Sequence, residues 1–238
     1  MIRTVILAAV FLAGAALMSL EMASFRLVQP EFGSDIVVWG SLISVFLGGL
    51  AIGAYLGGRL ADRGPAMWKL ALVLAVAGVV TLTLPLYAGA VLDWMYPGEG
   101  APLPAEWDRA GGGSASGSGA SDESAGGKLA VYEPPDLRWP VLGAGLLLFA
   151  GPSILLGMVT PYSARLLIRS IPSLGRGVGQ VSAVSTVGSI LGTLATAFYL
   201  VAWMGTRWLL AANGLVLLGL GVMLALAHLA ARRTPQKV

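Results

Sequence analysis

The sequence contains no cysteine, a single histidine and few charged residues. Without cysteine the chain has no disulfide, and it lacks the thiolate ligands of zinc and iron–sulfur sites. His228 is the one imidazole and has no sequence neighbours that would complete a metal site, so we expect no metal and no redox cofactor. Charged residues make up 11% of the 238 positions, against 56% hydrophobic ones, a composition that excludes an ordinary soluble domain.

The small excess of basic residues is not evidence for nucleic-acid binding. The formal net charge is +3 and the isoelectric point is about 9.4. The Lys and Arg residues are spread over several short segments rather than gathered into a basic groove, and they suit the anionic lipid of an inner leaflet better. We therefore expect the lipid bilayer, and no nucleic acid, as a partner.

Long apolar runs dominate what the sequence does contain. A helix needs about 20 apolar residues to cross a hydrocarbon core about 30 Å thick. Six runs approach or exceed that length, which predicts an all-α polytopic membrane protein with six transmembrane helices. The predicted spans are 5–20, 36–58, 70–92, 139–164, 178–204 and 208–231.

The basic residues sort onto alternate sides of these spans. With the N-terminus inside, ten of the fifteen Lys and Arg residues fall in inner segments and ten of the twelve acids fall in outer ones. This is the positive-inside pattern, and it predicts a multi-pass protein of the bacterial inner membrane with both termini in the cytoplasm. The first run also has features of a signal peptide, but no A-x-A site follows it and Glu21 stands where small residues are needed. An uncleaved first helix is the better interpretation.

Three spans precede and three follow one long outer segment. We divide the chain into a first half (1–95), a Gly/Ser/Pro-rich outer loop (96–137) and a second half (138–238). The centre of the loop, 111–127, reads GGGSASGSGASDESAGG and has no apolar surface to bury, so it is a flexible linker, natural or engineered. The segments 24–27 and 163–166 share Ser-x-Arg-Leu, and a 3+3 inverted repeat is one interpretation of that match.

Two spans carry small residues at intervals of four, which places them on one helix face. Gly49, Gly53 and Gly57 form such a row in the second span, and Gly188 and Gly192 form one in the fifth. Rows of this kind let two backbones approach closely, so we expect these glycines to pack against other helices.

A polar group of residues is the candidate substrate-binding site. Ser185 and Ser189 in the fifth span and Asn213 in the sixth are hypothesised to line a cavity. Glu21 is a carboxylate in an apolar span, and its charge destabilises the inserted helix unless it meets a cation or faces a cavity. Near the interface its side chain could instead reach the headgroups. Arg26 is included as a second charged candidate, but five residues along a helix it does not pair easily with Glu21.

The inner segment between the second and third spans carries a recognisable motif at Gly58, Asp62 and Arg63. It reads G-R-L-A-D-R and resembles the cytoplasmic signature of major facilitator transporters. Together, 19–63 and 157–205 resemble the membrane part of bacterial fused major-facilitator/spermidine-synthase-like proteins. The sequence contains no strand–turn–helix unit with G-x-G-x-x-G, so we expect that membrane module without a synthase domain.

Two functions are compatible with this interpretation, and neither is enzymatic, because no nucleophile has a base beside it. The first is a membrane subunit or anchor that docks another protein, such as a synthase-like cytoplasmic enzyme or a membrane complex. The alternative is a transporter of a small solute, with a polyamine as one candidate, in which two copies form a homodimer.

Overall fold

The computed structural model describes residues 2–95, 138–168 and 174–233, and every element within them is helical. The elements are α1 (Ile2–Phe32), α2 (Ile36–Asp62), α3 (Met67–Met95), α5 (Arg138–Leu167), α6 (Leu174–Ala195), the π-helical turn η2 (Thr196–Leu200), α7 (Val201–Trp203) and α8 (Thr206–Arg233). Six helical stretches are long and apolar enough to cross a membrane. The predicted all-α fold with six spans is confirmed.

The observed helices extend beyond the predicted spans. The first prediction ended at residue 20, yet α1 continues for 31 residues to Phe32 and contains Pro30 in its last turn. At 1.5 Å per residue it is about 46 Å long, so it tilts or projects beyond a 30 Å core. The fifth span is interrupted at its outer end, where the N–H of Val201 bonds to Thr196 O across a π turn.

Short turns with glycine end the first two helices. Gly33 has φ +77° and its N–H bonds to Gln29 O at 2.8 Å, which closes α1. Asp35 then accepts a hydrogen bond from Ile36 N and starts α2. Gly64, with φ +102°, follows α2 in the same way. Both glycines hold a left-handed backbone that other residues rarely adopt.

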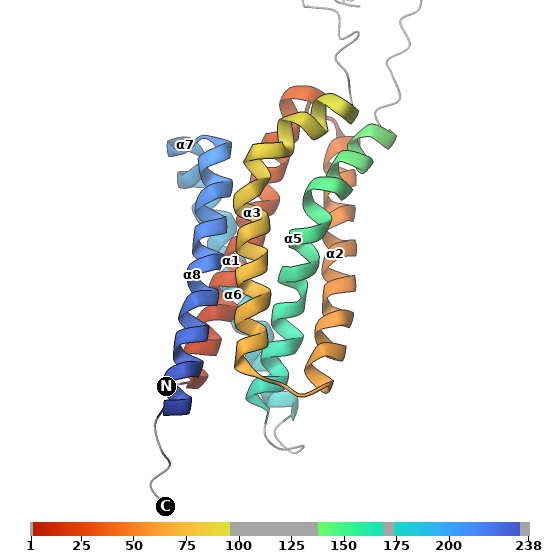
Figure 1. Cartoon of the computed structure of the whole chain (residues 1–238). Helices are drawn as coiled ribbons and strands as arrows, with labels where there is room; N and C mark the ends of the chain where they lie inside the picture. Colours follow the sequence, from red (N-terminus) through yellow and green to blue (C-terminus); the bar gives the residue numbers. More distant parts are fainter. Residues whose placement is uncertain (1, 96–137, 169–173, 234–238) are drawn as a thin grey trace, which may run out of the picture.

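Alternate connections lie at opposite ends of the bundle (Figure 1). α1 begins and α8 ends at the same end as the α2–α3 turn, and α3 ends and α5 begins at the other. We call these the inner and outer ends. The inner end carries Arg3, Arg59, Arg63, Lys69, Arg165 and Arg176 among the described residues.

Each span of the first half packs against a span of the second. The closest pairs are α1 with α6, α2 with α5, and α3 with α8, whereas spans within one half hardly touch. An inverted repeat exchanges α1 with α5, α2 with α6, and α3 with α8. Under that exchange the α1–α6 contact is equivalent to the α5–α2 contact, and the α3–α5 contact is equivalent to the α8–α1 contact. All four contacts are present, as the repeat requires.

The buried residues follow the same repeat. Gly49 and Gly188 are separated by the same number of residues as Gly53 and Gly192, and this constant offset defines the equivalent positions of the two halves. All four glycines are buried at contacts with another helix. The same spacing relates Ser24 to Ser163, Ala9 to Leu148, and Leu20 to Val159, which are all buried. The helix pairing and the buried positions therefore both fit a 3+3 inverted repeat.

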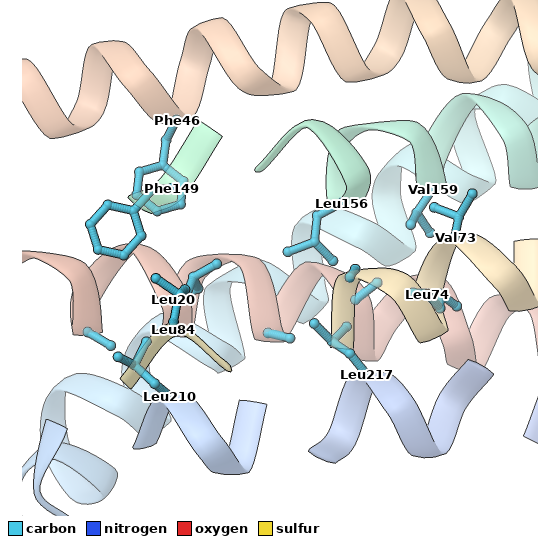
Figure 2. Packing of buried hydrophobic residues seen from close by; sticks show 14 of the residues in the cluster. Leu20, Phe46, Val73, Leu74, Leu84, Phe149, Leu156, Val159, Leu210 and Leu217 are labelled. Atoms are coloured by element: carbon cyan, nitrogen blue, oxygen red, sulfur yellow. The ribbon is translucent and has the colours of Figure 1, made fainter. Parts of the chain in front are cut away.

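The core runs along the centre of the bundle. Figure 2 shows Leu20 of α1, Leu84 of α3 and Leu210 of α8 close together, with the rings of Phe46 and Phe149 nearby. In lipid such contacts stabilise through close van der Waals packing, because the apolar surface gains little by leaving hydrocarbon. This packing joins α8 to α1 and α3, and α2 to α5.

Candidate functional site

A cavity of about 360 Å³ lies between α1, α2, α5 and α6. It extends from the middle of the bundle, at Leu17 and Leu156, toward the inner end, at Ala164 and Val178. Its lining is mainly apolar, with three hydroxyl side chains: Thr160, Ser182 and Ser185. A largely apolar cavity with a few convergent polar groups is the usual form of a small-molecule site.

Small side chains keep this space open. Gly14 and Gly157 line it, together with Ala13, Ala54 and Ala164. A Cβ added at Gly157 would lie 2.8 Å from Leu50 O, so α2 and α5 already touch backbone to backbone beside the cavity. The helices are thus held together by close contacts at the edge, while the small residues leave the centre unfilled.

The corresponding place toward the outer end is filled by aromatic rings. The repeat takes Ala164 to Phe25 and Val178 to Trp39, and these two rings stack with centroids 4.1 Å apart. Deeper in the bundle, Phe46 and Phe149 stand where the repeat places Ser185 and Val10, with ring centroids 5.7 Å apart. At these equivalent positions the two halves differ in side-chain size, with small side chains lining the cavity and aromatic rings standing toward the outer end.

Glu21 lies on the cavity-lining face of α1. At about 100° per residue it is only about 20° around the helix from Val10 and one turn beyond Leu17. Its side chain is half-buried and does not line the cavity itself. Within residues 2–95, 138–168 and 174–233 its carboxylate has no hydrogen-bond or ion-pair partner, and the neighbouring Ser24 hydroxyl bonds to the Glu21 carbonyl.

The structure separates the predicted substrate-binding residues. Ser185 lines the inner cavity, but the Ser189 hydroxyl donates to Gly14 O at 3.2 Å and joins α6 to α1. Asn213 Nδ2 donates to Ser19 Oγ at 2.8 Å and to Leu209 O at 3.0 Å, so it joins α8 to α1. These two are packing contacts in the structure and lie outside the cavity lining.

Arg26 belongs to a different cavity, of about 440 Å³, at the outer end between α1, α3 and α8. Arg207 and Glu31 also line it. Arg26 is turned about 140° around α1 from Glu21, which explains why the two charges do not meet. The structure therefore does not bring the two charged candidates into one site.

The glycine rows lie at backbone contacts. A Cβ added to Gly49 would lie 1.9 Å from Ser153 Oγ, at Gly53 2.1 Å from Ile154 O, and at Gly57 2.7 Å from the Met158 backbone. The second row has the same role. Cβ atoms at Gly188 and Gly192 would lie 2.1 Å from Phe11 O and 2.4 Å from Ala15 O.

The inner loop motif is attached to the end of α5. Asp62 forms an exposed ion pair with Arg165, with 3.8 Å between Oδ1 and Nε, while Gly58 and Arg63 have no comparable contact in the described residues. The buried Tyr162 hydroxyl donates to Ala66 O at 3.0 Å and accepts from Ala66 N at 2.9 Å. This tyrosine anchors the α2–α3 turn beside the mouth of the cavity.

Thr160 and Ser182 line the cavity but were absent from the sequence-based set. Thr160 precedes Pro161, and Pro161 also lines the cavity, so the polar–proline pair within an apolar span was an available signal. The predicted outer loop, 96–137, lies outside the described residues. Within the described residues no three His, Asp or Glu side chains are grouped as metal ligands would be.

Comparison of the chain with protein-family models, with curated proteins and with solved structures found no match. The resemblance to the fused major-facilitator/spermidine-synthase-like proteins remains a prediction from sequence. In its described residues the chain is an all-helical bundle with six helices of membrane-spanning length and hydropathy.

Proposed function

We propose that this chain is a carrier of a small solute, with the inner cavity as its solute site. The observation that carries the proposal is the position of the cavity, which lies where the two inverted halves meet and reaches the middle of the bundle. In transporters built from inverted repeats, the substrate site lies near the midplane at the repeat interface. The lining of the cavity extends from the middle of the bundle toward the inner end, which makes the inner surface the side from which we expect solute to enter or leave.

The proposal places the protein in the inner membrane of a bacterium, with the inner end of the bundle in the cytoplasm. Arg59, Arg63 and Lys69 at the α2–α3 turn, together with Arg165 and Arg176, support that orientation through the positive-inside rule. The cavity would then receive solute from the cytoplasm or release it there.

Transport by the purified protein in liposomes tests the proposal. A panel of labelled amines, amino acids, sugars and carboxylates is offered to vesicles with the parent protein and with two variants. Ser182→Trp places an indole in the cavity, whereas Ala183→Trp places it on the next residue, which is exposed and does not line the cavity. We expect a solute that the parent and Ala183→Trp transport and Ser182→Trp does not.

Two results would refute the carrier. One is the absence of uptake for every class in the panel by a parent protein that is folded and correctly inserted. The other is equal transport by Ser182→Trp and the parent, which would mean that the solute does not pass through this cavity.

A membrane subunit or anchor is the second candidate, and the poor burial of α6 favours it. α6 is the least buried of the six spans, and α2 presents a second row of small residues, Gly40, Ser44 and Gly48, on its exposed face. A Cβ at Gly40 or Gly48 meets no atom within 4 Å. Mild-detergent purification from the native host separates the candidates, because a stoichiometric second chain favours the subunit and a homodimer favours the carrier.

A further inference from the structure

Glu21 has features of a ligand-binding carboxylate rather than a structural one. It is half-buried in an apolar helix, and no cation or hydrogen-bond donor satisfies it within the described residues. Acidic residues held in such a position usually face a cavity or a partner, because a charge near hydrocarbon is costly. Glu21 points along the same face of α1 as Val10 and Leu17, which line the cavity below it.

Aromatic rings lie immediately beyond this carboxylate. Phe25 is one helical turn after Glu21, and side chains four residues apart on a helix are neighbours. The Phe25 ring stacks on Trp39 of α2 with an angle of 25° between the planes. Both rings are only partly buried, so part of their surface stays exposed.

We propose that Glu21, Phe25 and Trp39 form an outer binding site for an organic ammonium group. A carboxylate supplies the counter-charge, and the faces of aromatic rings attract cations, which together is the chemistry that recognises alkylated ammonium ions. A divalent metal is a poor fit, because Ca²⁺ and Mg²⁺ take several oxygen ligands and Glu21 has no second carboxylate grouped with it among the described residues.

The repeat relates this site to the inner cavity. It takes Glu21 to Thr160, Phe25 to Ala164 and Trp39 to Val178, and all three of those equivalents line the inner cavity. The proposed outer site thus stands at the first-half equivalents of three cavity-lining positions, where the side chains are larger. The inference rests on the proposed function, in which it makes the solute an organic cation that is bound at Glu21 on the outer side.

Arg26 adjoins Phe25 in sequence but lines the other outer cavity, with Arg207 and Glu31. Glu31 therefore provides a matched control. It is an acid on the same helix and near the same membrane surface, but it faces a different cavity.

Calorimetric binding of choline and of its uncharged isostere 3,3-dimethylbutanol to the purified protein tests the site. We expect the parent to bind choline and not the isostere, and Glu21→Gln to weaken choline binding by at least roughly tenfold. Phe25→Leu and Trp39→Leu should each weaken it by roughly three- to tenfold, while Glu31→Gln leaves it unchanged. Glu21→Asp retains the charge and should bind better than Glu21→Gln, which separates loss of charge from damage to the fold.

Each other outcome has a definite meaning. Failure of the parent to bind choline, or equal binding by the parent and Glu21→Gln, would overturn the site. Choline binding that depends on Glu21, without uptake of any solute of the panel into liposomes, would support the binding site and contradict the carrier. Transport that is unaffected by Glu21→Gln would be compatible with the carrier proposal and would contradict the proposed binding site.

Discussion

At the scale of single residues, the distance between helices is set by the residues that have no side chain. Gly53 meets the backbone of Ile154 and Gly157, whereas Gly48 on the same helix has open space around it. In the sequence both belong to rows of small residues spaced four apart. Which row faces another helix depends on the rotation of α2, and the sequence leaves that undetermined because both faces are apolar.

Gly53→Leu should destabilise the protein by more than about 2 kcal/mol, because its Cβ would overlap the α5 backbone, which cannot move aside like a flexible side chain. Gly48→Leu, its matched control, should stay within about 0.5 kcal/mol of the parent. Reversible denaturation in mixed micelles measures the difference. Equal stability of the two variants would show that the α2–α5 contact is not formed as described.

The Asn213–Ser19 hydrogen bond should contribute about 0.6 kcal/mol, the average for side-chain bonds between membrane helices. Asn213→Ala, Ser19→Ala and the double variant form a cycle whose coupling energy isolates the bond. The same unfolding measurement supplies all four values. A coupling of zero would indicate that Asn213 is turned elsewhere, such as toward a solute.

Polar residues within spans were the hardest to assign from sequence. Ser185, Ser189 and Asn213 were grouped as one polar lining. The structure separates them, because the Ser189 hydroxyl bonds to Gly14 O and the Asn213 amide bonds to Ser19 Oγ, whereas Ser185 lines the cavity. Their direction depends on which helix packs beside them. The spacing of residues in the sequence shows which of them share a helix face, but it does not show which helix packs against that face.

At the scale of elements, the inner turn depends on one tyrosine. Tyr162 is fully buried and its hydroxyl both donates to and accepts from the backbone of Ala66. Tyr162→Phe should cost about 1 to 3 kcal/mol, because Ala66 loses its partner. It should also speed thiol labelling of a cysteine placed at Pro65. Tyr55→Phe, on an exposed tyrosine, is the control and should change neither quantity. Unchanged labelling in Tyr162→Phe would mean that other contacts hold the turn.

The existence and order of the helices were predictable, and their ends were less so. Long apolar runs fix the spans because lipid demands internally hydrogen-bonded helices. The end of α1 was predicted wrongly, since polarity rises at Glu21 while the backbone remains helical to Gly33. The π turn at Thr196 has no signal in hydropathy, because it inserts a residue without changing composition.

At the scale of the whole molecule, the charge pattern predicts which end is cytoplasmic. The absence of cysteine provides a clean background for labelling. A cysteine at Ser34, in the exposed outer turn, should react with a membrane-impermeant reagent in intact cells, and one at Pro65 should react only after permeabilisation. The opposite result would reverse every statement of sidedness made above.

In the sequence, three matching residues within a four-residue segment favoured the repeat, and the helix pairing and buried positions of the structure also fit it. The difference in side-chain size between the cavity lining and its equivalents was not predictable in the same way. It results from pairs such as Ala164 and Phe25, whose equivalence becomes apparent only once the halves are aligned in space.

The pairing of each span with one from the other half has a consequence for biosynthesis. When α1, α2 and α3 have entered the membrane, their glycine faces have no partner, because those three helices hardly touch one another. We therefore expect the first half to stay as loosely associated helices in lipid until the second half is made. The two halves would then assemble like two subunits that share one polypeptide, and α3 would gain its main partner only when α8 is inserted.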